Sequence, residues 1–159
     1  MRPADPHKLG AQVTQEGTNF ALWAPAADAV EVCLFEGAER IETRFSLTHR
    51  DGPIWHGFLA GVKAGQLYGY RVYGPWRPEQ GWRFNPHKVL IDPYAHLISG
   101  ELALTPEIYG HQASDELGNG FLELQDSRDS APFVPLSVVT TESTRNILSL
   151  IHISEPTRR

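Results

Sequence analysis

Apolar and polar side chains alternate along several short runs in the first half of the chain. In residues 18–23, Phe20 and Leu22 fall on one face, and Asn19 and Ala21 fall on the other. A period of two residues is typical of a β-strand that buries one face. This alternation, or a short apolar run, predicts six strands, over residues 9–13, 18–23, 30–35, 40–48, 54–59 and 67–73.

Turn residues separate these runs. Glu16-Gly17 and Asp51-Gly52 suit tight turns, and Pro25 ends the second run. The chain shows no convincing helical period. Many short strands with turns between them predict an all-β fold. We expect an immunoglobulin-like antiparallel β-sandwich over residues 9–74, after a leader of residues 1–8.

The character of the chain changes after Gly74. Prolines punctuate the next segment at positions 75, 78, 86 and 93, yet it also carries large apolar side chains. A flexible linker would be rich in Gly and Ser and poor in aromatic residues. We therefore expect an irregular connector segment over residues 75–139 that packs against another body. Residues 101–129 are polar and weakly patterned, and we expect them to be poorly ordered in an isolated chain.

Composition and charge exclude several classes of function. The 159 residues carry a net charge of −5, which argues against nucleic acid because a phosphate-binding face needs a basic excess. No apolar run approaches a membrane-spanning length, and residues 1–10 contain no signal-peptide stretch. The single cysteine, Cys33, excludes an internal disulfide. Together these features predict a cytoplasmic protein with no nucleic-acid or membrane partner.

Metal ions and cofactors are not expected either. The seven histidines show no ligand spacing, and no glycine pattern that could cradle a phosphate occurs between residues 14 and 19. We therefore assign no metal ligand and no cofactor.

The last residues are foreign to the rest of the protein. Residues 148–158 (LSLIHISEPTR) match the translation of a transposase adapter used in preparing sequencing libraries. Segments of this kind are excluded from reasoning about the fold. We expect the natural sequence to end near residues 145–147, so that residues 140–159 form a truncated end. The alternative is a genuine C-terminal strand or helix.

Aromatic side chains gather between residues 55 and 84 and point to contact with sugars. Sugar rings present flat apolar C–H faces, for which aromatic rings are good platforms. On this basis we predict carbohydrate contacts for Trp55, Tyr68 and Tyr70. We add Arg71, because its guanidinium could donate hydrogen bonds to sugar hydroxyls. The alternatives are a core position for Trp55 and for at least one of the tyrosines, and a solvated or barrel-facing ion pair for Arg71.

Three stretches carry a resemblance to a known family. They are residues 9–11 with 18–27 (LGA, TNFALWAPAA), 55–59 with 65–75 (WHGFL, GQLYGYRVYGP) and 83–95 (RFNPHKVLIDPYA), followed by a weaker one at residues 129–135. In this order and spacing they resemble the N-terminal region of isoamylase-type glycogen debranching enzymes, of the α-amylase superfamily. The resemblance covers about residues 9–139. Leu136 departs from it, because the family usually has a basic residue there.

The resemblance implies a carbohydrate-binding module placed ahead of a (β/α)₈ catalytic barrel. The whole enzyme would hydrolyse α-1,6 branch linkages, and its partners would be glycogen or branched maltodextrin and its own barrel. Such a barrel needs about 250 residues and carries the two catalytic carboxylates. We assign no catalytic residue here and expect this chain alone to be inactive. The connector side chains expected to face the barrel are Trp76, Trp82, Phe84, Asn85, Pro86, Asp92 and Tyr94.

Two other functions stay open. One is a stand-alone glycan-binding or regulatory module, in which the connector at residues 75–95 would have no purpose. The other is the N-terminal module of a related trehalose-releasing hydrolase, which shares the sandwich but less of the Phe84-Asn85-Pro86 stretch. Both fit the residues less well than the debranching type.

Overall fold

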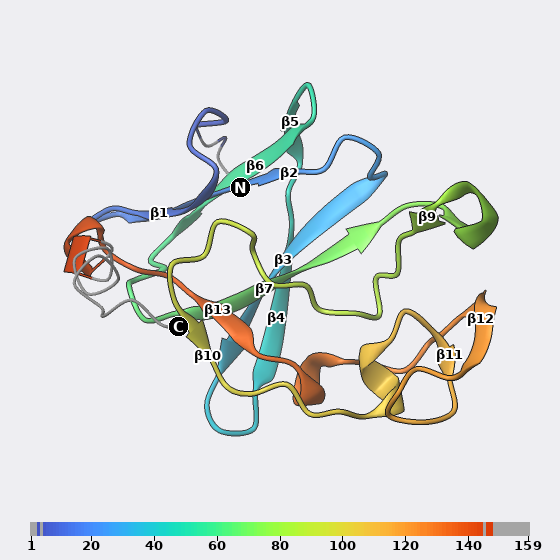
Figure 1. Ribbon diagram of the computed structural model, residues 1–159. Coiled ribbons are helices and arrows are strands. Elements are labelled where there is room, and N and C mark those ends of the chain that lie inside the picture. The colour runs from blue at the N-terminus through green and yellow to red at the C-terminus, as the bar shows by residue number, and fades with distance from the viewer. Residues whose placement is uncertain (1–2, 4, 145, 148–159) are drawn as a thin grey trace, which may run out of the picture.

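The computed structural model describes residues 3, 5–144, 146 and 147. Within them the chain forms two main antiparallel sheets and two small two-stranded ones, the latter in an irregular segment wrapped beside the main sheets (Figure 1). The stretch that matches adapter sequence, residues 148–158, lies outside the described residues.

The first sheet has four strands in the order β1-β2-β6-β5. Its strands are β1 (Gly10–Val13), β2 (Gly17–Trp23), β5 (His49–Asp51) and β6 (Ile54–Ala60). All neighbouring pairs are antiparallel. The two predicted turns, at Glu16-Gly17 and Asp51-Gly52, lie where β1 meets β2 and where β5 meets β6.

The second sheet has five strands in the order β10-β13-β7-β3-β4. They are β3 (Ala29–Glu36), β4 (Ile41–Ser46), β7 (Leu67–Tyr73), β10 (Ile98–Ser99) and β13 (Leu136–Val138). These pairs are also antiparallel. The predicted all-β antiparallel sandwich is therefore confirmed, and the six predicted runs coincide with β1, β2, β3, β4, β6 and β7.

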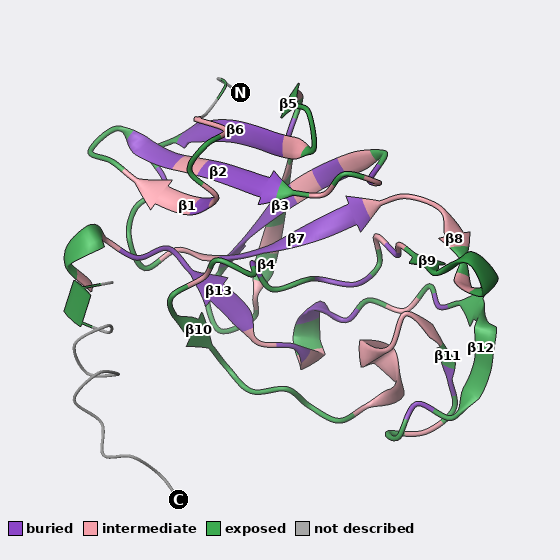
Figure 2. Ribbon diagram, turned by 45° about the horizontal axis from the view of Figure 1, so that its top comes forward, coloured by how far each residue is buried: buried purple, intermediate pink, exposed green. Residues whose placement is uncertain are grey.

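The main core lies between the two sheets. Phe20 and Leu22 of β2 share this core with Val32 of β3 and with Tyr68 and Tyr70 of β7. Figure 2 shows β2, β6 and β7 buried along most of their length. The period-two pattern follows from this packing, because alternate side chains of each strand point into the space between the sheets.

A second, smaller core lies where the connector covers the other side of the second sheet. Cys33 and Phe35 of β3 pack there with Val89, Leu136 and other connector side chains. The connector thus buries apolar area with the sandwich itself.

The sandwich does not end at residue 74, where the sequence prediction placed its boundary. Strand β13, from the end of the connector, pairs with β7, so that Ser137 lies opposite Tyr68 and Val138 opposite Leu67. Three residues are too few for an alternation to be recognised, which is why the pattern missed this strand.

The connector is irregular, as expected, but it holds several short elements. They are β8 (Trp76–Arg77), η1 (Pro78–Gln80), β9 (Trp82–Arg83), η2 (Pro106–Ile108), β11 (His111–Ala113), β12 (Gly120–Gln125) and η3 (Ala131–Phe133). The segment of residues 101–129, for which we expected poor order, contains the hairpin of β11 and β12. This hairpin lies beside the β8–β9 hairpin, and the Trp76 indole donates to the Glu123 carbonyl at 2.9 Å (Figure 1).

Candidate functional site

Trp55, a predicted sugar contact, lies in the core. Its indole Nε1 donates to the Ala24 carbonyl at 3.0 Å, and its ring packs with Leu22 and Leu59. The Arg50 guanidinium lies 4.7 Å from the ring centroid. With its N–H used and its ring buried, Trp55 fills the sandwich rather than offering a ring to a sugar.

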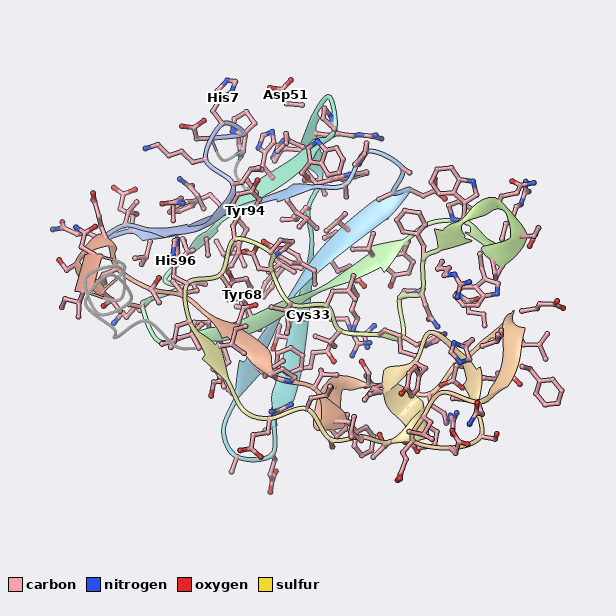
Figure 3. All side chains as sticks on the ribbon, viewed as in Figure 1. His7, Cys33, Asp51, Tyr68, Tyr94 and His96 are labelled. Atoms are coloured by element: carbon pink, nitrogen blue, oxygen red, sulfur yellow. The ribbon has the colours of Figure 1, made fainter. Side chains whose placement is uncertain are left out.

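Tyr68 is also buried, and its hydroxyl donates to Asp92 Oδ2 at 2.6 Å. The Asp92 backbone N–H donates to Ser137 Oγ, and Asp92 Oδ1 accepts from the Tyr94 backbone N–H. Burial raises the pKa of the Asp92 carboxyl, although the hydrogen bond from Tyr68 opposes the shift. Figure 3 shows Tyr68 and Cys33 in the middle of the molecule. This buried cluster fixes the connector on β7.

Arg71 is 1% exposed and lies on the opposite face of β7 from Tyr70. Its guanidinium donates to both carboxylate oxygens of Glu42 at 2.8 Å, to Asp129 Oδ1 at 2.8 Å and to the Pro86 carbonyl at 3.0 Å. Arg71 does form ion pairs, but they are made with Glu42 and Asp129 of this chain at a buried position, whereas the predicted alternative was a solvated or barrel-facing pair. Arg71 joins β4 to two points of the connector.

A second polar cluster joins the two halves of the connector. Lys88 Nζ donates to Asp126 Oδ2 and to the carbonyls of Glu107 and Arg128, each at 2.7 Å. The Asn85 amide donates to the Gly110 and Asp126 carbonyls, and its Oδ1 accepts from the His87 N–H. Lys88 and Asn85 thus hold the β11–β12 hairpin against residues 85–88.

The side chains predicted to face a barrel divide into two groups. Asn85 and Asp92 are buried and engaged as described, Phe84 packs on the sandwich core, and Pro86 accepts from Arg71. Trp76 is half-buried, and its indole donates to the Glu123 carbonyl. In contrast, Trp82 is 39% exposed and Tyr94 is 52% exposed. Leu90, Ile91, Leu97 and Ile98, which the sequence analysis did not single out, are exposed on the same segment.

A groove of about 670 Å³ opens between the end of β2 and the connector. Among the side chains that line it are Leu22, Trp23, Tyr70, Trp76, Trp82 and Leu90. Trp23 is 58% exposed, and the sequence analysis did not assign it a role. The sequence signal that could have identified Trp23 as exposed is its position on the outward face at the end of β2, directly before the Ala24-Pro25 turn. The volume falls within the range typical of small-ligand sites.

One polar group of this groove has spare hydrogen-bonding capacity. The Tyr70 hydroxyl is buried and, among the residues that the structure describes, finds no hydrogen-bond partner. Burial raises its pKa well above the ordinary value, and the nearby Asp92 carboxyl adds to the shift, so the hydroxyl stays protonated. Tyr70 is the one predicted sugar contact that both lines a groove and keeps a free polar atom.

Within residues 3, 5–144, 146 and 147, no three His, Cys, Asp or Glu side chains are placed to hold a metal ion. No helix in that part of the chain is both long and apolar enough to cross a bilayer.

The family to which the chain belongs is shown by its similarity to known proteins. Residues 8–95 match the model of carbohydrate-binding module 48, the isoamylase N-terminal domain, and the chain belongs to this family. Over 139 residues the chain is 45% identical to the glycogen debranching enzymes of Salmonella typhi and Salmonella dublin. The match covers 87% of this chain and 19% of those enzymes, so the chain spans about a fifth of their length.

A solved structure shows the same fold. A ligand-free pullulanase variant from Klebsiella pneumoniae superposes with a TM-score of 0.50, over 84% of this chain and 10% of the pullulanase chain. Sequence identity in the superposed part is 23%, a level at which the likeness concerns the fold alone.

Proposed function

We propose that this chain is the N-terminal module of a glycogen debranching enzyme that hydrolyses α-1,6 branch linkages in glycogen or limit dextrin. The observation that carries the proposal is the extent of the 45% identity, which runs over 139 residues. The family model matches residues 8–95 only, so the identity reaches beyond the module into the connector. The relatives therefore share the sandwich and the segment that would lead to the catalytic part.

The exposed apolar side chains of the connector support this proposal. Trp82, Tyr94, Leu97 and Ile98 are among the large apolar residues that face solvent in this chain. All four belong to the connector, and exposed large apolar side chains gathered on one segment favour a contact with another body. We propose that the rest of the enzyme covers Trp82 and Tyr94, whereas Phe84, Asn85, Pro86 and Asp92 shape the connector from within.

The chemistry would reside outside this chain. Retaining hydrolysis of a glycosidic bond needs two carboxyl groups about 5 Å apart across the scissile bond. Enzymes of the α-amylase superfamily carry them at the C-terminal ends of barrel strands. The described residues form a sandwich and a connector and include no such barrel. The module would contribute binding and support, with glycogen or branched maltodextrin as partner. The buried thiol of Cys33 agrees with a cytoplasmic location, which we also propose.

The test compares the full-length protein with this chain. The full-length protein should release linear maltodextrins from glycogen limit dextrin, measured as new reducing ends. This chain alone should release none. Trehalose as the product would contradict the proposal and favour the trehalose-releasing alternative.

The proposed contact of Trp82 and Tyr94 with the rest of the enzyme is tested separately in the full-length protein. Trp82→Ser and Tyr94→Ser should weaken the contact between the module and the catalytic part, seen as a lower inactivation temperature. Phe121→Ser is the matched control, because Phe121 is exposed on β12 and was not predicted to face the barrel. Equal effects from all three substitutions would contradict the assigned face.

A further inference from the structure

The loop that joins β11 to β12 contains the dipeptide Asn119-Gly120, and both residues are exposed. The hairpin to which they belong lies to one side of the two main sheets (Figure 1). Asparagine is a chemically labile residue, because the backbone nitrogen of the following residue can attack its side-chain amide. Glycine permits that attack best, since it has no side chain to restrict the approach. Reaction at this loop therefore depends on where the Gly120 N–H points and on what holds the Asn119 amide.

The Gly120 nitrogen takes no part in the pairing of β12 with β11. The Ser114 N–H donates to the Asn119 carbonyl at 2.6 Å, so Ala113 and Gly120, which lie opposite each other, form a non-hydrogen-bonded pair. In such a pair each N–H points away from the partner strand. Within the described part of the chain β12 pairs with β11 alone, so the Gly120 N–H is directed to the open edge of β12.

The fold itself requires glycine at position 120. A Cβ atom built on Gly120 would overlap the Gln112 carbonyl oxygen and would lie 2.9 Å from the Ser114 nitrogen. The φ angle of Gly120 is +148°, which residues with a side chain rarely adopt. The close approach of β11 therefore places directly after Asn119 the residue that hinders its cyclisation least.

Asn119 is held in the loop by Asp115. Its Nδ2 donates to Asp115 Oδ2 at 2.8 Å, and its backbone N–H donates to Asp115 Oδ1 at 3.0 Å. Both bonds lie in an exposed loop, where exchange with water leaves a hydrogen bond only a small net contribution. The Asn119 side chain can therefore leave Asp115 and turn toward the Gly120 nitrogen at little cost.

The reaction needs water as its only co-reactant. The Gly120 nitrogen forms a bond to Asn119 Cγ, the Cγ–Nδ2 bond breaks, and Nδ2 leaves as ammonia with the proton of the Gly120 nitrogen. Water then opens the five-membered imide at one of its two carbonyl carbons. Opening at one carbon gives aspartate, and opening at the other gives isoaspartate, in which the backbone runs through the side-chain carbonyl. Either product adds one negative charge to the loop.

We propose that Asn119 is a site of spontaneous deamidation, and that the new carboxylate, placed against Asp115, loosens the loop between β11 and β12. The amide that now donates to Asp115 Oδ2 becomes a group with no proton to donate. At present the hydrogen bond from Asn119 is the main cause that lowers the pKa of Asp115. After deamidation two carboxylates would face each other there, and the contact would change from attraction to repulsion.

The first experiment incubates this chain at pH 7 and at pH 9 and maps its peptides by mass spectrometry, in which deamidation adds about 1 Da. Asn119 should react at least about tenfold faster than Asn146, which is also exposed but precedes the β-branched Ile147. Asn85 should not react, because Pro86 offers no N–H. The rate at Asn119 should rise with pH, since the attacking nitrogen must lose its proton. Isoaspartate, detected with a carboxyl methyltransferase, should be among the products.

The second experiment measures the effect on the loop by limited digestion with thermolysin, which can cut at the exposed Leu117 and Phe121. Asn119→Asp should be cut about two- to fivefold faster, as expected for one like-charge contact at an exposed site. The matched variant that combines Asn119→Asp with Asp115→Asn should restore the original rate, because an amide again faces a carboxylate. Asn119→Ser should abolish the mass gain at this position.

Three outcomes of the first experiment would overturn the site. They are no mass gain at Asn119, equal rates at Asn119 and Asn146, and a product without isoaspartate, which would indicate direct hydrolysis of the amide. An Asn119→Asp variant that thermolysin cuts no faster than the unmodified chain would overturn the loosening of the loop.

Discussion

Gly69 of β7 and Val89 of the connector lie so close that a Cβ atom built on Gly69 would overlap the Val89 side chain. The same Cβ would lie 3.2 Å from the Leu90 carbonyl oxygen. The next residue, Tyr70, exchanges two backbone hydrogen bonds with Leu90. A bare backbone at position 69 is therefore what allows the connector to lie along β7 and close one side of the groove.

The first prediction concerns this contact. Gly69→Ala should destabilise the fold by about 1–3 kcal/mol, because the added methyl overpacks a buried contact. The change should appear as a lower midpoint in urea unfolding followed by far-UV circular dichroism. Gly110→Ala is the matched control, because its Cβ would meet only Trp76, at an ordinary 3.5 Å. A Gly69→Ala variant as stable as the control would contradict the close approach.

The strands could be predicted from the sequence because each buries alternate side chains in one core. Alternation along residues 67–73 placed Tyr68 and Tyr70 on the face opposite Arg71, as the structure does. The pattern could not show that the Arg71 face is buried as well. Its cover comes from Pro86 and Asp129, far along a segment that has no periodicity of its own.

The groove was less accessible to sequence reasoning than the fold. Trp23 and Trp55 both lie on strands among apolar neighbours, yet one is 58% exposed and the other is buried. The difference arises because Trp23 ends β2 beside the open groove, whereas Trp55 lies opposite Leu22 in the pairing of β2 with β6. Local pattern does not contain that long-range pairing, so the aromatic residues gathered between positions 55 and 84 were recognised, whereas Trp23, which lies outside that range, was missed.

The second prediction concerns the buried ion pair of Arg71 and Glu42. Arg71→Met should destabilise the fold by about 3 kcal/mol, the lower end of the range for a broken buried pair, because Glu42 would keep only its partner Arg44 and Asp129 would lose Arg71 as well. The double variant Arg71→Met with Glu42→Leu should recover much of that loss, since the charges that remain, on Arg44 and Asp129, belong to side chains that are 45% and 50% exposed. Urea midpoints of the two single variants and the double variant give the coupling free energy between Arg71 and Glu42. Additive losses would show that the two side chains do not act as a pair.

The third prediction concerns acid stability. Burial alone would raise the pKa of Glu42 and of Asp129, but hydrogen bonds to the Glu42 carboxylate from Arg71 and to Asp129 from the Ala131 N–H and Arg71 hold both pKa values below the ordinary range. A carboxyl group with a lowered pKa in the fold stabilises it above the ordinary pKa of about 4. That contribution is lost as the pH falls through the lowered pKa.

Unfolding free energy should therefore decrease as the pH falls below about 4, when it is measured by urea titration at a series of pH values. Glu42→Gln should show a shallower decrease, because one of the responsible groups is gone. Asp92, whose pKa is raised by burial, acts in the opposite direction and should reduce the slope without reversing it. A stability that rises between pH 4 and pH 3 would show that Asp92 outweighs the ion pairs.

The fourth prediction concerns the single thiol. Burial, reinforced by the Glu42 carboxylate, raises the pKa of Cys33 to about 12. The thiolate is the reactive form, so at pH 8 the folded chain should react with a disulfide reagent only when Cys33 becomes exposed. Adding urea should raise the labelling rate in parallel with the unfolded fraction, and Gly69→Ala should shift that rise to lower urea. Because both measurements then report one cooperative transition, labelling at the full rate in a chain that is still folded by circular dichroism would show that the connector opens away from β3 on its own.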